Sequence, residues 1–231
     1  MYVKFIPVSI GCFLMFIFIF PHNIPGASTG KQDIKTRIES YLQTGETLLK
    51  EGDIVLRMNK DPFSEFIRYF NKKDKNFSHA GLVVRDSEEL MIYHMASEDG
   101  NPMKLMRKQS LADFADPHHN FGYAIYRYKL TKPELNTIRE QVKNWYNLPV
   151  HFDTAFNLTS DNELYCSEMV QKAITKGTYS RIKIHSTTLN TLQANAIRAY
   201  YKLNSQSGMK IIAIDDLYVN AECRKIAQYT F

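Results

Sequence analysis

The sequence predicts one α+β domain over residues 29–231, and three observations support this fold class. The chain has 231 residues, enough for one sizeable hydrophobic core and too few for two comfortable domains. Its composition is typical of a globular protein, with 44% hydrophobic and 23% charged residues. The predicted elements run as a helix, several strands, two helices and closing strands, which favours α+β over regular βαβ alternation.

The first 28 residues have the pattern of a secretory signal peptide. Lys4 precedes an apolar run over residues 5–20, and the small residues of 26–28 follow. This run of 16 residues is shorter than the roughly 20 needed to span a bilayer. We therefore expect export to the periplasm or secretion, with an uncleaved anchor and proximity to a membrane as the alternative.

Local patterns then predict the elements of the first half of the domain. Apolar residues recur at helical spacing over residues 33–50, and Pro62 occupies the first turn of a short helix that reaches Phe70. Two β-rich apolar runs flank a turn-like stretch and therefore predict a hairpin. The strands expected here are 54–58, 80–84, 90–95 and 123–130.

The second half contains two clear helices. Thr131, Pro133 and Glu134 are placed as an N-cap, a first-turn proline and a capping-box partner, for a helix that reaches Tyr146. The polar loop 159–163 leads into a helix that begins near Cys166 and ends before Gly177. A further helix is expected over 192–203 and closing strands over 211–214 and 224–229.

Cys166 is the first candidate for chemistry. It lies where the polar loop meets the helix, so its thiol is expected to feel the positive end of the helix dipole and unpaired backbone N–H groups. Both effects favour the nucleophilic thiolate, and the same N–H groups could hold an oxyanion. A small buried core residue is the alternative interpretation. Cys223 is expected to be structural, and both thiols to be free.

His79 and His94 are the second pair of candidates. His79 opens the strand that contains Gly81, and His94 follows 15 residues later on the partner strand of the predicted hairpin. Pairing of these strands would place both imidazoles at neighbouring positions of one sheet. A general base oriented by a second polar group is the arrangement that activates a cysteine nucleophile.

These residues carry a resemblance to a known family. The segments Gly52-Asp53-Ile54-Val55, Ser78-His79-Ala80-Gly81-Leu82-Val83, Phe152-Asp153 and Tyr165-Cys166-Ser167-Glu168 resemble, in this order, the YiiX-type permuted papain-like hydrolases of the NlpC superfamily. The resemblance covers about residues 48–176, with a weaker echo at 214–217. It implies a circularly permuted papain-like fold in which an antiparallel sheet packs against the helix of the catalytic cysteine.

The resemblance also implies residue roles. Cys166 would be the nucleophile, His79 its base, and a polar residue of the next strand the third member of the set. The resemblance implies a glutamate in the third position of many relatives, whereas His94 matches this position here, and Glu98 is the fallback. Tyr165 and Asp153 are candidates for the oxyanion and substrate site, Tyr165 through its hydroxyl.

The favoured function is hydrolysis of an amide bond in a peptide or a peptidoglycan-like fragment. A lipid acyltransferase, thioesterase or phospholipase similar to the lecithin:retinol acyltransferase branch is the first alternative, because His94 replaces the glutamate. An inactive binding module is the second. Dispersed positive charge argues against nucleic-acid binding, and we expect no cofactor and no metal, because His118-His119 has no further ligand at metal-binding spacing.

Overall fold

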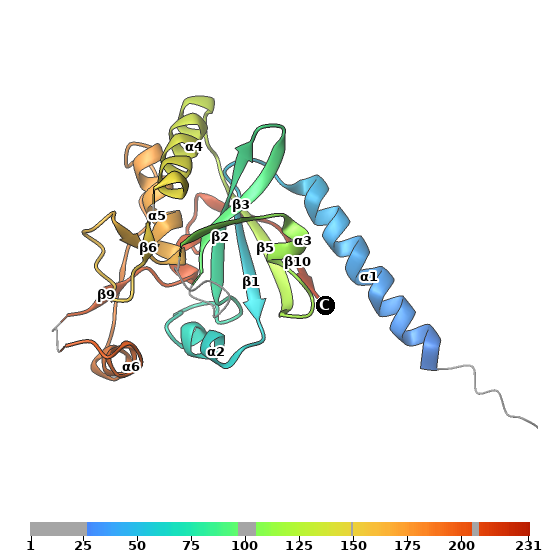
Figure 1. Cartoon of the computed structure of the whole chain (residues 1–231), viewed down its shortest axis with the longest axis horizontal. Coiled ribbons are helices and arrows are strands. Elements are labelled where there is room, and N and C mark those ends of the chain that lie inside the picture. Colours follow the sequence, from blue (N-terminus) through green and yellow to red (C-terminus); the bar gives the residue numbers. More distant parts are fainter. Residues whose placement is uncertain (1–26, 97–104, 149, 205–207) are drawn as a thin grey trace, which may run out of the picture.

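The computed structural model describes residues 27–96, 105–148, 150–204 and 208–231. In this part of the chain a six-stranded antiparallel sheet lies at the centre, with helices on its faces and ends (Figure 1). The predicted α+β class is therefore confirmed. The predicted signal segment, residues 1–28, lies almost entirely outside the described residues, as does Glu98, and the signal remains a prediction.

The strands of the central sheet follow the order β10-β5-β1-β2-β3-β4. Two small two-stranded sheets, β6-β7 and β8-β9, accompany it. The bounds of the strands are β1 Ile54–Asn59, β2 His79–Asp86, β3 Glu89–Met95, β4 Met106–Gln109, β5 Asn120–Tyr128, β6 His151–Phe152, β7 Glu163–Leu164, β8 Thr187–Thr188, β9 Lys210–Ile211 and β10 Cys223–Thr230.

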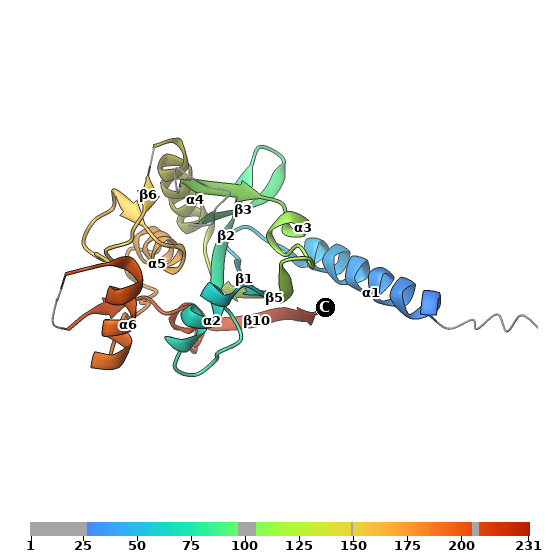
Figure 2. The same cartoon turned by 60° about the horizontal axis from the view of Figure 1, so that its bottom comes forward.

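The helices lie around this sheet. In Figures 1 and 2, α1 extends from one end of the molecule and α6 lies at the opposite end. None of the helices in the described part of the chain is long and apolar enough to cross a membrane. The bounds are α1 Ala27–Leu48, α2 Pro62–Tyr69, α3 Leu111–Phe114, α4 Lys132–Asn147, α5 Cys166–Gly177, α6 Thr191–Tyr201 and the 3₁₀ turn η1 Asp215–Leu217.

Hydrogen bonds between residues close in the sequence explain where α2 and α4 begin. Asp61 caps α2 by accepting the Ser64 N–H at 2.9 Å, and Pro62 occupies the first turn. The predicted capping box of α4 is present, with Thr131 and Glu134 each accepting a backbone N–H from the other. The predicted hairpin is also present as β2-β3, with Leu82 opposite Tyr93.

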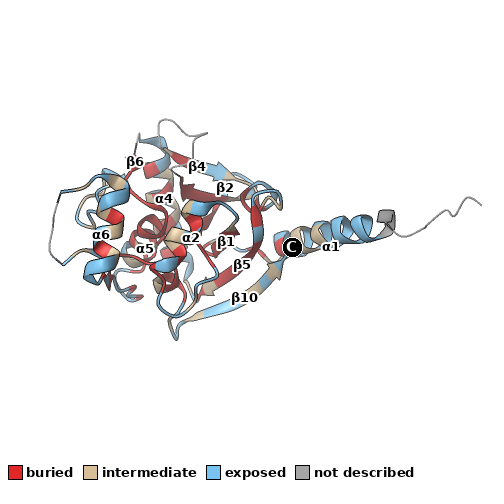
Figure 3. Cartoon of the chain, turned by 90° about the horizontal axis from the view of Figure 1, so that it is seen from below, coloured by how far each residue is buried: buried red, intermediate tan, exposed pale blue. Residues whose placement is uncertain are grey.

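The central strands are buried on both faces, as Figure 3 shows by colour. On one face Ile54, Leu56, Leu82 and the apolar side of α5 form the main core. The other face packs against α3 and includes Phe114. A third cluster joins α2 to α6. This two-sided burial explains why residues 80–84 form a continuous apolar run in the sequence.

Three parts of the fold differ from the sequence prediction. β4 and α3 were not predicted, since four residues each are too few to establish a periodicity. The predicted loop 159–163 ends in a short strand: Glu163 and Leu164 form β7, which pairs in parallel with β6. The predicted strand over 211–214 was wrong: β9 ends at Ile211.

Side chains explain why the backbone after Ile211 is not part of a strand. The N–H and C=O of Ile212 bond to Tyr165 and Ser167, and the Ala213 N–H bonds to Asp216. Because these polar groups are already satisfied by side chains, the segment has no need of a ladder partner. It passes directly into η1, beside the start of α5.

Candidate active site

Cys166 is the first residue of α5, as the sequence predicted. Tyr165 precedes it in extended conformation, with φ −102° and ψ 171°, and its N–H donates to Glu168 Oε2 at 3.3 Å. Glu168 thus turns back onto the residue before the helix and helps to define where the helix begins. The Cys166 side chain therefore lies in the first turn of α5, where backbone N–H groups have no intrahelical acceptor.

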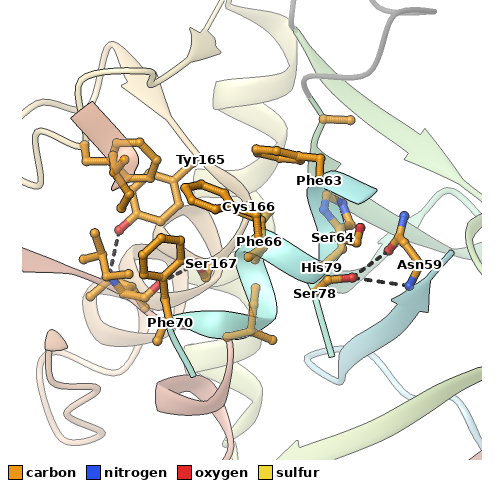
Figure 4. A pocket seen from close by; sticks show the side chains of 18 of the residues that line it. Asn59, Phe63, Ser64, Phe66, Phe70, Ser78, His79, Tyr165, Cys166 and Ser167 are labelled. Carbon is orange, nitrogen blue, oxygen red and sulfur yellow. Dashed lines mark hydrogen bonds between the residues drawn. The ribbon is translucent and has the colours of Figure 1, made fainter. Parts of the chain in front are cut away.

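The residues on either side of Cys166 are fastened to one residue of the C-terminal segment. The Tyr165 hydroxyl accepts the Ile212 N–H at 2.7 Å, and the Ser167 hydroxyl donates to the Ile212 C=O at 2.6 Å. All three residues are buried. In Figure 4 a dashed line from the Tyr165 hydroxyl marks its hydrogen bond with the Ile212 N–H. The two bonds fix the beginning of α5 and with it the position of the sulfur.

His79 and His94 form a hydrogen-bonded pair. His79 Nε2 lies 2.8 Å from His94 Nδ1, and His94 Nε2 lies 2.7 Å from Gln109 Oε1. β2, β3 and β4 supply one member each, and Phe114 packs against both imidazole rings. Gly81 allows Ile92 and Phe114 to pack closely against β2, since a Cβ there would clash with Ile92 and approach Phe114.

Burial and nearby positive charge both favour the neutral form of the two imidazoles. Burial, followed by the charge of Arg57, lowers the pKa of His79 well below its usual range, and the same two causes lower the pKa of His94 to about 3. Arg57 lies opposite His79 in the β1-β2 ladder and is 5% exposed. Its guanidinium donates to the Phe114 C=O at 3.1 Å and lies over the Phe114 ring.

The thiol of Cys166 is not in the state that the sequence predicted. Backbone N–H groups of Ala80 in β2 and of Ser167 in the first turn of α5 lower the pKa of the sulfur, and the second of these is the effect expected at a helix N-terminus. Burial acts in the opposite direction and is larger, so the pKa of Cys166 is raised. Both pKa shifts favour the neutral forms, a thiol at Cys166 and an imidazole at His79, in the site without substrate. The proton must leave the sulfur when a substrate is attacked.

Cys166 and His79 line the same cavity, which has a volume of about 380 Å³. In Figure 4, His79, Ser78, Ser64 and Asn59 lie on one side, and Tyr165, Phe70 and Ser167 lie on the other side with Cys166 and Phe66 between them. The polar side chains of the cavity thus gather at the histidine, where Phe63 also lies, and the lining beyond the sulfur is mostly apolar. The apolar lining comes from α2, α6 and the two loops around α5: Phe66, Ile67, Phe70, Phe152, Phe156, Tyr165, Ile197, Tyr200, Tyr201, Ile211 and Ile212.

Stacked aromatic rings connect α2 to α6 over this apolar end. The rings of Phe63 and Tyr200 are 4.8 Å apart, and those of Phe66 and Tyr200 are 5.4 Å apart. Tyr200 is 55% exposed. These contacts join α2 to α6 through aromatic rings that also line the cavity.

Asp153 has a supporting position. Its buried carboxylate accepts the backbone N–H groups of Ala155 and Asn157 at 2.8 and 2.6 Å. Between them lies Phe156, which has φ +55° and lines the cavity. Asp153 itself is not among the lining residues and shapes the site through this loop. Its pKa is raised by burial.

Among the described residues, Cys223, His118, His119, His151 and His185 lie apart from the cavity lining. Cys166 and Cys223 are not bonded to each other, and burial raises the pKa of Cys223 to about 12. His119 Nδ1 pairs with Asp116 at 2.8 Å in an exposed turn. In the described ranges no cluster of three or more His, Cys, Asp or Glu side chains could hold a metal ion.

Sequence analysis missed three contributors to this site. Arg57 appears in the sequence only as a charged residue in a strand, and Gln109 belongs to a strand that was not predicted. The aromatic residues of 63–70 and 200–201 were assigned to helices but not to a common cavity. Arg57 is the single charged residue within the apolar run 54–58, and this is the signal that could have singled it out.

This fold and this cysteine–histidine cavity define a papain-like cysteine hydrolase. The sequence matches the family described as "Permuted papain-like amidase enzyme, YaeF/YiiX, C92 family" over residues 48–219. The chain belongs to this family of cysteine amidases, which confirms the resemblance and the permuted order of histidine before cysteine. A comparison with curated proteins gives no match.

A solved structure supports the same fold. The chain resembles the structure titled "Crystal structure of metalloprotein yiiX from Escherichia coli O157:H7", with a TM-score of 0.63 and 16% sequence identity. The match covers 79% of this chain and 98% of the other. That title describes a metalloprotein, whereas the described residues of this chain do not provide a cluster of metal ligands.

Proposed function

We propose that this protein hydrolyses an amide bond whose acyl side is apolar and whose amine side is polar, using Cys166 as the nucleophile and His79 as the base. The observation that supports this substrate class is the division of one cavity into a polar end at His79 and an aromatic end beyond the sulfur. The family supports amide hydrolysis as the reaction.

The reaction would begin from the neutral pair. His79 takes the thiol proton as the sulfur attacks the carbonyl carbon, and the carbonyl oxygen becomes an oxyanion held by N–H groups in the first turn of α5. The C–N bond then breaks while His79 returns the proton to the leaving nitrogen. Water, deprotonated by His79, hydrolyses the thioester and restores the thiol.

Proton transfer fixes the orientation of the substrate. Because His79 protonates the leaving nitrogen, the amine must lie at the end of the cavity where His79 lies. Ser64, Ser78 and Asn59 line this end. The acyl group stays on the sulfur and extends into the other end, between Phe66, Phe70 and their aromatic neighbours.

The lining also bears on the alternatives. Lipid substrates predict an apolar groove beside Cys166, and peptide fragments predict a polar cleft with charged anchors. The aromatic end favours an acyl chain or another large apolar group over a charged stem peptide. The presence of both Cys166 and His79 in one cavity argues against an inactive binding module. Action outside the cytoplasm, which rests on residues 1–28, is part of this proposal.

A matched substrate series tests the proposal. N-acyl glycines with acyl chains of increasing length are incubated with the enzyme, and released glycine is quantified by mass spectrometry. Each buried methylene contributes about 0.8 kcal/mol, so kcat/KM should rise about fourfold per methylene until the cavity is filled. Amides of the reversed polarity, with an acetyl group and a long alkylamine, should be poor substrates.

Variants separate the chemistry from the substrate class. Cys166→Ala and His79→Gln should abolish release from every substrate, whereas the control Cys223→Ser should retain it. Faster cleavage of peptidoglycan stem peptides than of any acyl glycine would contradict the apolar acyl side. Intact activity of Cys166→Ala would contradict the nucleophile. Phospholipids in the same assay show whether esters are preferred to amides.

A further inference from the structure

We propose that Gln109 is a positioning residue that fixes the tautomers of both histidines and so makes Nδ1 of His79 the atom that accepts the thiol proton. This inference rests on the proposed function, because it assigns a role within the same site. Its evidence is the chain of two hydrogen bonds that starts at Gln109 Oε1 and ends at His79 Nε2.

The donor and acceptor of each of the two hydrogen bonds follow from the chemistry of Gln109. Gln109 Oε1 is a carbonyl oxygen and can only accept, so His94 Nε2, at 2.7 Å, must bear a proton. A neutral imidazole has one N–H, which leaves His94 Nδ1 as an acceptor. The atom 2.8 Å from it, His79 Nε2, must then be the donor. The second nitrogen of His79, Nδ1, is left with the lone pair that a general base requires.

The residues around His79 and His94 favour the neutral form of both imidazoles, and the direction of the two hydrogen bonds depends on this form. Arg57 of β1 and Arg107 of β4 place positive charge near the pair, and His94 is 0% exposed. On the side of α3 the neighbour is the apolar ring of Phe114. A protonated imidazole is therefore disfavoured, and an amide acceptor fits this environment better than a carboxylate that would attract a second proton.

β4 holds the Gln109 side chain in place. Gln109 pairs with Ile92 in the β3-β4 ladder, and Arg107 pairs with His94. Gln109 follows His94 by 15 residues and belongs to the last strand of the sheet. The edge strand β4 thus supplies Gln109, the last residue of the two hydrogen bonds. Gln109 would affect activity through His94 and not through contact with the substrate.

The first test is a direct observation of the tautomers. Nitrogen-15 NMR of the histidine side chains in the full chain should show the proton on Nε2 in both His79 and His94 at neutral pH. A proton on Nδ1 of either ring would overturn the proposal, since the relay would then run in the opposite direction. Substitution of each histidine in turn provides the assignment.

The second test uses alkylation of Cys166 by iodoacetamide, which needs no knowledge of the substrate. The rate is followed against pH, and mass spectrometry separates Cys166 from Cys223. Gln109→Met removes the acceptor at similar volume and should slow Cys166 alkylation about 10- to 100-fold, by analogy with the loss caused by removing the partner that orients a metal-binding histidine. Gln109→Glu keeps an acceptor and should restore the rate, with its acid limb shifted upward by about one pH unit or more, because a carboxylate favours protonated imidazole.

A variant of Lys108, next to Gln109 in β4, serves as the control. Lys108→Gln changes the neighbouring exposed residue of β4, which pairs with Asp86, and should leave rate and pH profile unchanged. A wild-type rate and profile in Gln109→Met would overturn the role of Gln109. Loss of alkylation in His79→Gln together with normal Gln109→Met would leave the proposed function intact while rejecting this inference. Melting temperatures show whether a slow variant is merely unfolded.

Discussion

Removal of the Tyr165 hydroxyl distinguishes a structural role from a catalytic one. In Tyr165→Phe the buried N–H of Ile212 loses the acceptor that lies 2.7 Å away. An unsatisfied buried donor costs about 1–3 kcal/mol. For a chain of this size, 1 kcal/mol corresponds to roughly 2–4 °C in melting temperature, so we expect a decrease of about 4–8 °C for a loss near 2 kcal/mol.

The partner bond predicts a smaller and coupled effect. Ser167→Ala removes the donor to the Ile212 C=O at 2.6 Å, and a carbonyl tolerates a lost partner better than an N–H does. We expect about 1 kcal/mol. Both bonds end on Ile212, so the double variant should deviate from additivity by at least about 0.5 kcal/mol. Urea unfolding of the four chains measures this coupling, and the exposed Tyr179→Phe serves as the control.

Activity decides between the two roles of Tyr165. If its hydroxyl only fastens the start of α5, Tyr165→Phe should lower stability, and kcat on an acyl glycine should fall modestly. A hydroxyl that donates to the oxyanion would lower kcat by about 10²–10³. A fall of that size with an unchanged melting temperature would refute the structural argument and restore Tyr165 as an oxyanion donor.

Two further predictions concern stability. Gly81→Ala places a methyl group against Ile92 and should destabilise the fold by about 1–3 kcal/mol in urea unfolding; a neutral substitution would mean that the sheet relaxes at this position. The guanidinium of Arg181 and the bonds from Thr131 outweigh the opposing effect of burial and lower the pKa of Glu134 to about 2, below the value of 4.5 expected in the unfolded chain. Its stabilising contribution is therefore complete above pH 4.5 and is lost as the pH falls toward 2, so the free energy of unfolding should decrease less steeply over this range in Arg181→Met, and identical pH profiles would contradict it.

Local patterns determined much of this fold. The proline in the first turn of α2, the N-cap of α4, the hairpin β2-β3 and the start of α5 near Cys166 depend on residues within a few positions of one another, and all were predicted. The segment after Ile211 was predicted incorrectly, because its backbone partners are Tyr165 and Ser167, more than forty positions earlier. Apolar composition there indicated a strand, but side chains had already taken its polar groups.

The sequence by itself determined the reaction: a cysteine at a helix start and a histidine at a strand start, in the order of a permuted papain-like amidase. Only the tertiary structure decided the directions of the pKa shifts. Burial and the charge of Arg57 lower the pKa of His79, whereas at Cys166 burial alone raises the pKa and outweighs the backbone N–H groups and Arg57. The tertiary structure also brought Gln109 to His94, and the aromatic residues of α2 and α6 to one cavity. These groups are distant in the chain and become neighbours only when the sheet and its covering helices pack together.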